Sequence, residues 1–199
     1  MTPFSSIIIH HLSDRTERQN GIPCLYAYLN SQVQETHNPT YILADILAQL
    51  ISHTGRFSAL THLHKLCTDQ RRQPSVEEYL QLLGCEFKPL PKAFLVIDAL
   101  DECPDYDPSN ARDVLLGAVL RLPDNVRILI TSRYDRSVER KFNPDSQLEI
   151  IANDKDIRNY ILTRMDRYED FKQLMTENDP GKSLLNHMCN TIVKRAQGM

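Results

Sequence analysis

Two short apolar runs, separated by one stretch of helical periodicity, place the strongest constraint on how this chain can fold. Residues 93–97 are apolar throughout, and residues 126–130 are apolar except for Arg127. Continuous rather than alternating apolar character is typical of parallel strands that are buried on both faces. Apolar residues recur at helical spacing from Ala111 to Leu122, which predicts a crossover helix between the two strands. The two runs therefore predict neighbouring parallel strands of an α/β domain.

The same alternation of strands and helices extends along the rest of the chain. Further strands are predicted at 24–29, which is short and aromatic-rich, and at 148–151. Apolar spacing and capping residues predict helices over 7–12, 39–50, 59–66, 75–84, 153–161 and 183–196. Asn38 and Asn153 are expected to cap the second and fifth of these helices. In the fourth of these, Ser75 begins a capping box and Gly84 is expected to end the helix. The predicted fold class is α/β, with a mostly parallel sheet flanked by helices.

Composition excludes several functional classes. The chain has 199 residues and a net charge of −3, so no global basic field favours nucleic acid or an acidic membrane surface. No apolar run approaches the roughly 18 residues that a membrane span needs. The five cysteines include no C-x-x-C pair, which makes a zinc site or a disulfide framework a poor interpretation. We therefore expect a cytoplasmic protein with reduced thiols, without nucleic-acid or membrane partners.

Three acidic side chains directly follow the first apolar run. Asp98, Asp101 and Glu102 form a D-x-x-D-E pattern at the carboxyl end of that strand. In open α/β sheets, ligands bind beyond the carboxyl ends of the strands. An aspartate there can hold Mg²⁺, and a neighbouring acid can orient or deprotonate an attacking water. The alternative interpretation is a solvated loop after a core strand, which three clustered acids make less attractive.

The second apolar run also ends in polar residues, Thr131, Ser132 and Arg133. Because one helix connects the two parallel strands, we expect Thr131 and Arg133 to lie beside the acids. A guanidinium group suits bidentate contact with a phosphate. The plainer alternative is a surface arginine that pairs with Asp135 and contributes little to stability.

At this point the sequence resembles the NACHT branch of the STAND P-loop NTPases. The resemblance rests on Phe94–Glu102 as a Walker B strand with an acidic extension and on Ile128–Arg133 as the sensor strand. It extends to residues 148–161 and 192–199, and its style is that of the fungal group with a nephrocystin-like N-terminal NACHT region. The resemblance implies a P-loop NTPase-like fold that binds ATP or GTP with Mg²⁺ and couples nucleotide state to oligomerisation and signalling.

The resemblance also implies roles for individual residues. Asp98 would hold Mg²⁺, Asp101 and Glu102 would be the catalytic acids, and Arg133 with Thr131 would contact the nucleotide. The family's G-x-x-x-x-G-K-[ST] loop does not occur in this sequence. Counting back from the helix at 7–12, Thr2 falls near the position of the loop's metal-binding hydroxyl. The triplet Gly181-Lys182-Ser183 is no substitute, because the required earlier glycine is Thr176 and no buried strand precedes it.

We therefore expect an incomplete NACHT core over residues 1–165, lacking the first strand and the phosphate loop. Residues 166–199 are expected to form a linker and a C-terminal helix that ends before a winged-helix region. Two functions remain in contention. One is a nucleotide-dependent oligomerisation switch of innate-immunity or incompatibility type, in which this chain alone does not hydrolyse nucleotide. The other is a non-catalytic interaction module, or remnant, that pairs with itself or with intact NACHT relatives through an exposed sheet edge.

Overall fold

The computed structural model describes residues 3–18, 21–32, 38–103, 110–151, 153–165, 167–168 and 183–196. The chain divides into two compact units, residues 1–141 and 142–199. The first unit holds the sheet, and the described residues of the second contain helices and no strand. The domain division expected between residues 165 and 166 concerns the family's organisation and stays a prediction.

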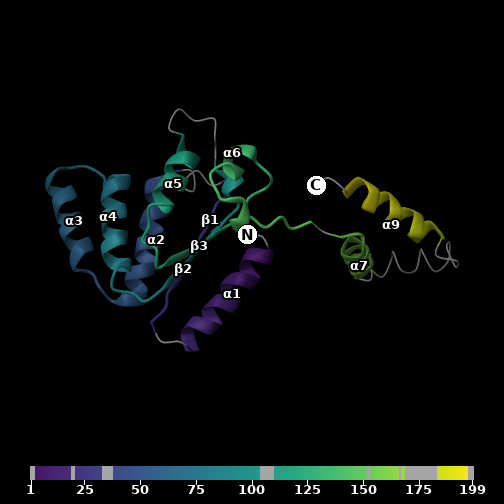
Figure 1. Ribbon diagram of the computed structural model, residues 1–199, viewed down its shortest axis with the longest axis horizontal. Coiled ribbons are helices and arrows are strands. Elements are labelled where there is room, and N and C mark those ends of the chain that lie inside the picture. Colours follow the sequence, from purple (N-terminus) through teal and green to yellow (C-terminus); the bar gives the residue numbers. More distant parts are fainter. Residues whose placement is uncertain are drawn as a thin grey trace. The chain divides into compact units, whose positions relative to one another are not determined.

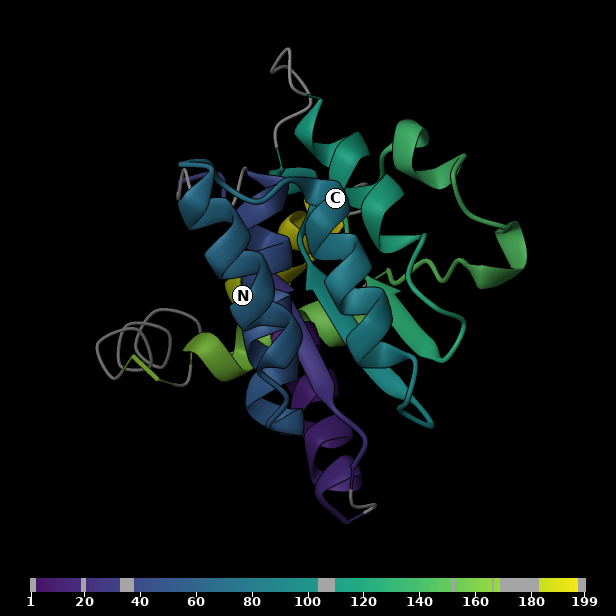
Figure 2. The same ribbon diagram turned by 90° about the vertical axis from the view of Figure 1, so that its left-hand side faces the viewer.

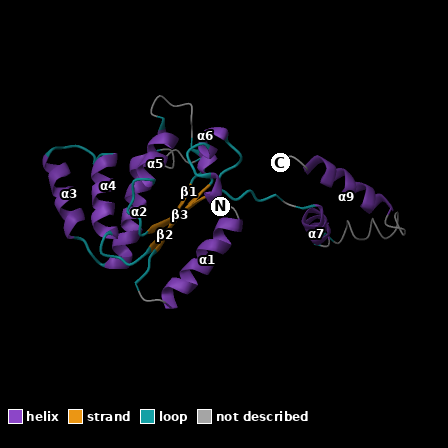
Figure 3. Ribbon diagram, in the orientation of Figure 1, coloured by secondary structure: helices purple, strands orange, loops and turns teal. Residues whose placement is uncertain are grey.

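A three-stranded parallel sheet lies at the centre of the first unit (Figure 3). Its strands, in spatial order, are β1 (Cys24–Tyr28), β2 (Ala93–Asp98) and β3 (Val126–Ile130). Pairing is parallel on both sides of β2, with Leu25 opposite Leu95 and Leu95 opposite Ile128. The predicted α/β class with a parallel sheet flanked by helices is therefore confirmed.

One face of this sheet carries a layer of several helices (Figures 1 and 2). They are α2 (Pro39–Thr54), α3 (Ser58–Asp69), α4 (Val76–Phe87) and α5 (Ala111–Val119). The predicted caps are present: Asn38 accepts from the Thr40 amide at 3.0 Å, and Ser75 forms a reciprocal capping box with Glu78.

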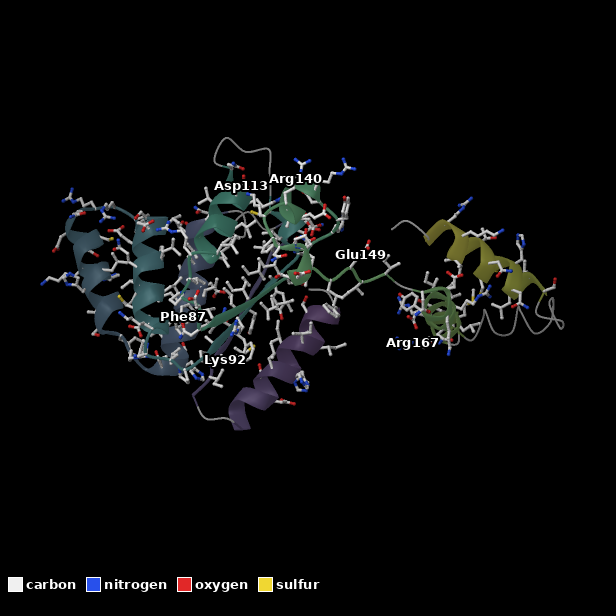
Figure 4. The ribbon with its side chains drawn as sticks, in the orientation of Figure 1. Phe87, Lys92, Asp113, Arg140, Glu149 and Arg167 are labelled. Carbon is white, nitrogen blue, oxygen red and sulfur yellow. The ribbon has the colours of Figure 1, made fainter. Side chains whose placement is uncertain are left out.

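The end predicted for the helix beginning after Ser75 is wrong. Helix α4 continues past Gly84 to Phe87. A glycine inside a helix costs only about 1 kcal/mol relative to alanine. Phe87, labelled in Figure 4, has no exposed surface, so burying it outweighs that cost.

A single helix, α1 (Pro3–Arg18), covers the opposite face (Figure 1). The Ser13 hydroxyl of α1 bonds to the Cys24 thiol, whose pKa is raised by burial. Coverage by one helix is incomplete. An apolar groove of about 250 Å³ remains between α1 and the strands, lined by Leu12, Phe94, Leu95, Val96, Arg127, Ile128 and Leu129.

The two edges of the sheet differ in how their backbone groups are used. At the β1 edge, the Gln49 side chain of α2 accepts from the Tyr26 amide at 3.0 Å and donates to the Tyr26 carbonyl at 2.8 Å. The Gln49 side-chain nitrogen also donates to the Asp45 carboxylate at 2.9 Å. At the other edge, β3 pairs only with β2 among the described residues. The middle of the β1 edge, at Tyr26, is therefore closed by a side chain, whereas the β3 edge borders the groove.

The second unit contains η3 (Pro144–Ser146), α7 (Asp154–Met165) and α9 (Ser183–Ala196). Helices α7 and α9 contact each other and bury three side chains, Ile161, Cys189 and Val193. Asn153 caps α7 as predicted, accepting from the Asp156 amide at 2.9 Å. No helix in the described ranges is long and apolar enough to cross a membrane.

The strand predicted at 148–151 is not formed. This segment is extended but unpaired in the described structure, and Leu148 is 82% exposed. The β preference of a short apolar run is realised through pairing and burial rather than by the backbone alone. Without a neighbouring strand to pair with, this apolar run does not form a strand.

Candidate functional site

The candidate site lies where β2 and β3 end and where α1 begins. Strand β2 ends at Asp98, Ala99 follows with φ 60° and ψ 53°, and a short 3₁₀ turn, η2 (Leu100–Glu102), carries the other two acids. A non-glycine residue in the left-handed region costs about 1–2 kcal/mol. Two features hold this turn in place: the Leu100 side chain is buried, and the Leu100 amide donates a hydrogen bond to the Thr131 carbonyl at 2.9 Å.

Asp98 is the buried centre of the site, with 1% of its surface exposed. Its Oδ1 accepts hydrogen bonds from the Ser5 hydroxyl of α1 and, at 2.7 Å, from the Thr131 hydroxyl. The Thr131 oxygen in turn accepts from the Ala99 amide at 3.0 Å. Two hydroxyl donors thus bond to the same oxygen of the buried carboxylate, and they join α1, β2 and the end of β3 around it.

Asp101 and Glu102 face the segment that carries Arg133. The Arg133 amide donates to Asp101 Oδ1 at 3.0 Å, and its guanidinium lies 3.5 Å from each of the two carboxylates. The Arg133 side chain is 84% exposed, so these ion pairs are screened by solvent. Hydrogen bonds from Ser31, and then the charge of Arg133, lower the pKa of Glu102.

A second arginine holds the turn from the inside. Arg112 of α5 is 6% exposed and donates to the carbonyls of Cys103 at 3.2 Å and Asp101 at 3.4 Å. It also donates to Asp135 at 2.6 Å. Asp135 caps α6 (Arg136–Glu139), and hydrogen bonds from Ser137, then Arg112, lower its pKa. The alternative pairing of Arg133 with Asp135 is therefore wrong, since Arg112 takes that carboxylate.

Comparison with protein families gives a match over more than half of the chain. The family model described as Nephrocystin 3, N-terminal matches residues 2–133. The chain belongs to this family. The matched residues include all the residues predicted for the site, and the match ends at Arg133. No curated protein and no solved structure gives a significant match.

Five of the six residues predicted for the site of this nephrocystin 3 N-terminal region fall together. Asp98, Thr131, Asp101, Glu102 and Arg133 are joined by hydrogen bonds or ion pairs at one end of the sheet. The sixth residue, Thr2, lies outside the described residues. The described part of the chain contains no cluster of three or more His, Cys, Asp or Glu side chains arranged for a metal.

Sequence reasoning missed Ser5, Ser31 and Arg112. Ser5 and Ser31 lie far along the chain from their partners, Asp98 and Glu102. No local sequence pattern identifies a serine that will bond to residues at the end of a strand. Arg112 did carry a signal. It lies in the first turn of α5, where the helix dipole disfavours a cation, so a specific partner was to be expected.

Proposed function

We propose that this chain supplies the Walker B and sensor half of a nucleotide switch of the NACHT type. The intact site would bind ATP or GTP with Mg²⁺ and couple nucleotide state to self-association in the cytoplasm, in the manner of the fungal nephrocystin-like group. One observation carries the proposal. Two carboxyl ends of parallel strands, with Asp98 and Thr131 on them, converge with the first turn of α1. This is where ligands bind in open α/β sheets.

The oxygen atoms gathered at Asp98 are of the kind that bind a magnesium ion. Mg²⁺ is held in nucleotide sites by one or two carboxylates, with water and substrate phosphates completing the coordination. Asp98 would hold the ion, with the Ser5 and Thr131 hydroxyls bonded to the same carboxylate. When bound, Mg²⁺ neutralises charge on the nucleotide phosphates. A single buried carboxylate is therefore enough, and a cluster of three acids around the metal is not required.

We propose that Arg133 exchanges its two carboxylate partners for a nucleotide phosphate. Its guanidinium pairs with Asp101 and Glu102 at 3.5 Å while remaining mostly exposed. A phosphate would compete well for this group, because it accepts two parallel hydrogen bonds from a guanidinium fork. Release of Arg133 would leave Asp101 and Glu102 available to orient a water molecule. The phosphate-binding loop would have to be supplied, so we propose that this chain alone does not hydrolyse nucleotide.

The test is calorimetric binding of Mg²⁺–ATP and Mg²⁺–GTP, to the chain and to a version extended ahead of Thr2 by a strand and a G-x-x-x-x-G-K-[ST] loop. We expect no micromolar binding by the chain and micromolar binding by the extended version. In the latter, Asp98→Ala should abolish the Mg²⁺-dependent part, whereas the matched change Asp145→Ala, on the exposed η3, should not. An extended version that is folded but binds neither nucleotide would refute the proposal.

A second candidate function is favoured by the β3 edge. We propose, as the alternative, a non-catalytic module that pairs with itself or with a NACHT relative through this edge. Parallel pairing alternates, so the backbone of Ile128 faces away from β2 while Arg127 and Leu129 face it. Unpaired strand edges of this kind accept strands from other chains. The adjacent groove would receive apolar side chains of the added strand.

The alternative predicts association that depends on the Ile128 amide. In sedimentation experiments the chain should form dimers, and Ile128→Pro should prevent them, because proline at an edge position removes only an outward donor. The matched control is Gln49→Ala at the closed β1 edge, which should not prevent association. A chain that stays monomeric at all concentrations contradicts the interaction module and leaves the nucleotide switch untouched.

A further inference from the structure

Arg112 is a buried cation whose place in its helix is unfavourable. It lies in the first turn of α5, near the positive end of the helix dipole, and only 6% of its surface is exposed. A charge removed from water at such a position costs free energy unless it is paired and hydrogen-bonded. The contacts it makes must therefore account for its presence.

Those contacts reach two segments of the candidate site: the turn η2 with its two acids, called the acidic turn below, and the segment that follows Arg133. Nε and Nη2 donate to the carbonyls of Cys103 and Asp101, at 3.2 and 3.4 Å, which fixes the backbone of the acidic turn. Nη1 donates at 2.6 Å to Asp135, which lies two residues after Arg133. The other carboxylate oxygen of Asp135 accepts from the amide and hydroxyl of Ser137, both at 2.7 Å. Arg112 thus ties the acidic turn to a rigid helix cap.

The ion pairs between Arg133 and the two acids cannot by themselves fix the position of Arg133. Arg133 is 84% exposed, and its guanidinium contacts with the acids are 3.5 Å long. Of its contacts with the two acids, only the one made by its amide is short, at 3.0 Å to Asp101. That bond requires the turn and the β3–α6 connection to keep their separation, which the Arg112 fork spans. Lysine, with a single point charge, cannot reach two carbonyls and a carboxylate at once.

We propose that Arg112 is a positioning residue that holds the acidic turn and Arg133 at their working separation. The contacts described above are to two backbone carbonyls and to Asp135, and not to the side chains proposed to meet the nucleotide. It acts through the backbone of Asp101 and through Asp135. The importance of this role rests on the proposed function, but the role itself concerns the geometry of the chain without any ligand.

The test compares Arg112→Met, Arg112→Lys and Arg121→Met in the chain by NMR. Arg121 is the matched control. It is an exposed arginine just after α5, and two of its nitrogens donate to the Glu77 carboxylate. In Arg112→Met we expect the pKa of Glu102 to rise toward its ordinary value. Hydrogen exchange of the Arg133 amide should accelerate about tenfold. Arg112→Lys should not restore either property, and Arg121→Met should change neither.

If Arg112→Met does not fold, Asp135→Asn replaces it. Asparagine keeps the helix cap but weakens the link to Arg112, so the same two readouts should move in the same direction by less. A folded Arg112→Met protein with an unchanged Glu102 pKa and an unchanged Arg133 exchange rate overturns the proposal. Because neither readout involves nucleotide, a failure of the calorimetric test leaves this result intact, and the converse also holds.

Discussion

The two faces of the sheet are built in different ways. The face under α2, α4 and α5 is closed by side chains with no exposed surface, such as Leu43, Leu50 and Leu83. The face under α1 has a groove, a partly exposed Tyr26 and, at its carboxyl end, the polar contacts of Asp98. The first face is therefore closely packed and should supply most of the stability, whereas the second keeps a groove and the polar contacts on which both proposed functions rest.

Removing a buried leucine from the packed face should have the largest effect. Leu50→Ala leaves a cavity beneath α2 and should lower the free energy of unfolding by about 2–5 kcal/mol. Leu12→Ala, on α1 beside the groove, removes the same atoms from a site already open on one side. It should cost less than half as much. Urea unfolding monitored by circular dichroism measures both, and equal losses would break the comparison between the faces.

Asp98 provides the next largest effect, on the α1 face. Asp98→Ala leaves the Ser5 and Thr131 hydroxyls without their acceptor, at a cost of about 1–3 kcal/mol. Asp98→Asn keeps an acceptor oxygen and should cost less. The same unfolding experiment ranks the two variants. Alanine proving no worse than asparagine would mean that the hydrogen bonds to Asp98 do not hold α1 to the sheet.

Much of the fold was predictable because its signals are local. The runs at 93–97 and 126–130 were long enough and apolar enough to be identified as buried strands, and Asn38 and Ser75 marked helix starts through capping chemistry. The failure at 148–151 has the opposite cause. Whether an extended apolar segment becomes a strand depends on a partner that no local pattern supplies.

The residues of the site also divide into those with a local sequence signal and those without one. Asp98, Asp101 and Glu102 were visible because acids directly follow a buried strand, and Thr131 and Arg133 because the next strand ends there. Ser5 and Arg112 were not visible, since their partners lie far along the chain, at a separation of 93 residues for Ser5 and Asp98. Sequence reasoning found the residues at the strand ends and missed those that hold them.

A smaller effect should follow from opening the closed edge of the sheet. Gln49→Ala removes the side-chain bonds to both backbone groups of Tyr26, which should lower stability by about 1 kcal/mol. Hydrogen exchange of the Tyr26 amide should accelerate. Gln81→Ala is the matched control, since Gln81 is an exposed residue of α4, and it should change stability by less than about 0.5 kcal/mol. An unchanged Tyr26 amide would show that Gln49 does not close this edge.

The smallest effect on stability belongs to the outer surface of the helical layer, at the start of α4. Two nitrogens of Arg72 bind Glu78 at 2.6 and 2.7 Å, and with the Ser75 amide they lower the pKa of Glu78 from 4.5 to about 2. A lowered pKa in the folded state stabilises the protein above pH 4.5, and this contribution is lost as pH falls toward 2. The pair is on the surface, so the loss should be slight compared with that of Leu50→Ala. Carboxyl NMR should place the Glu78 titration near 2, and Arg72→Met should move it partly back toward 4.5. A Glu78 that titrates near 4.5 in the unchanged chain would mean that the arginine does not hold this helix start in solution.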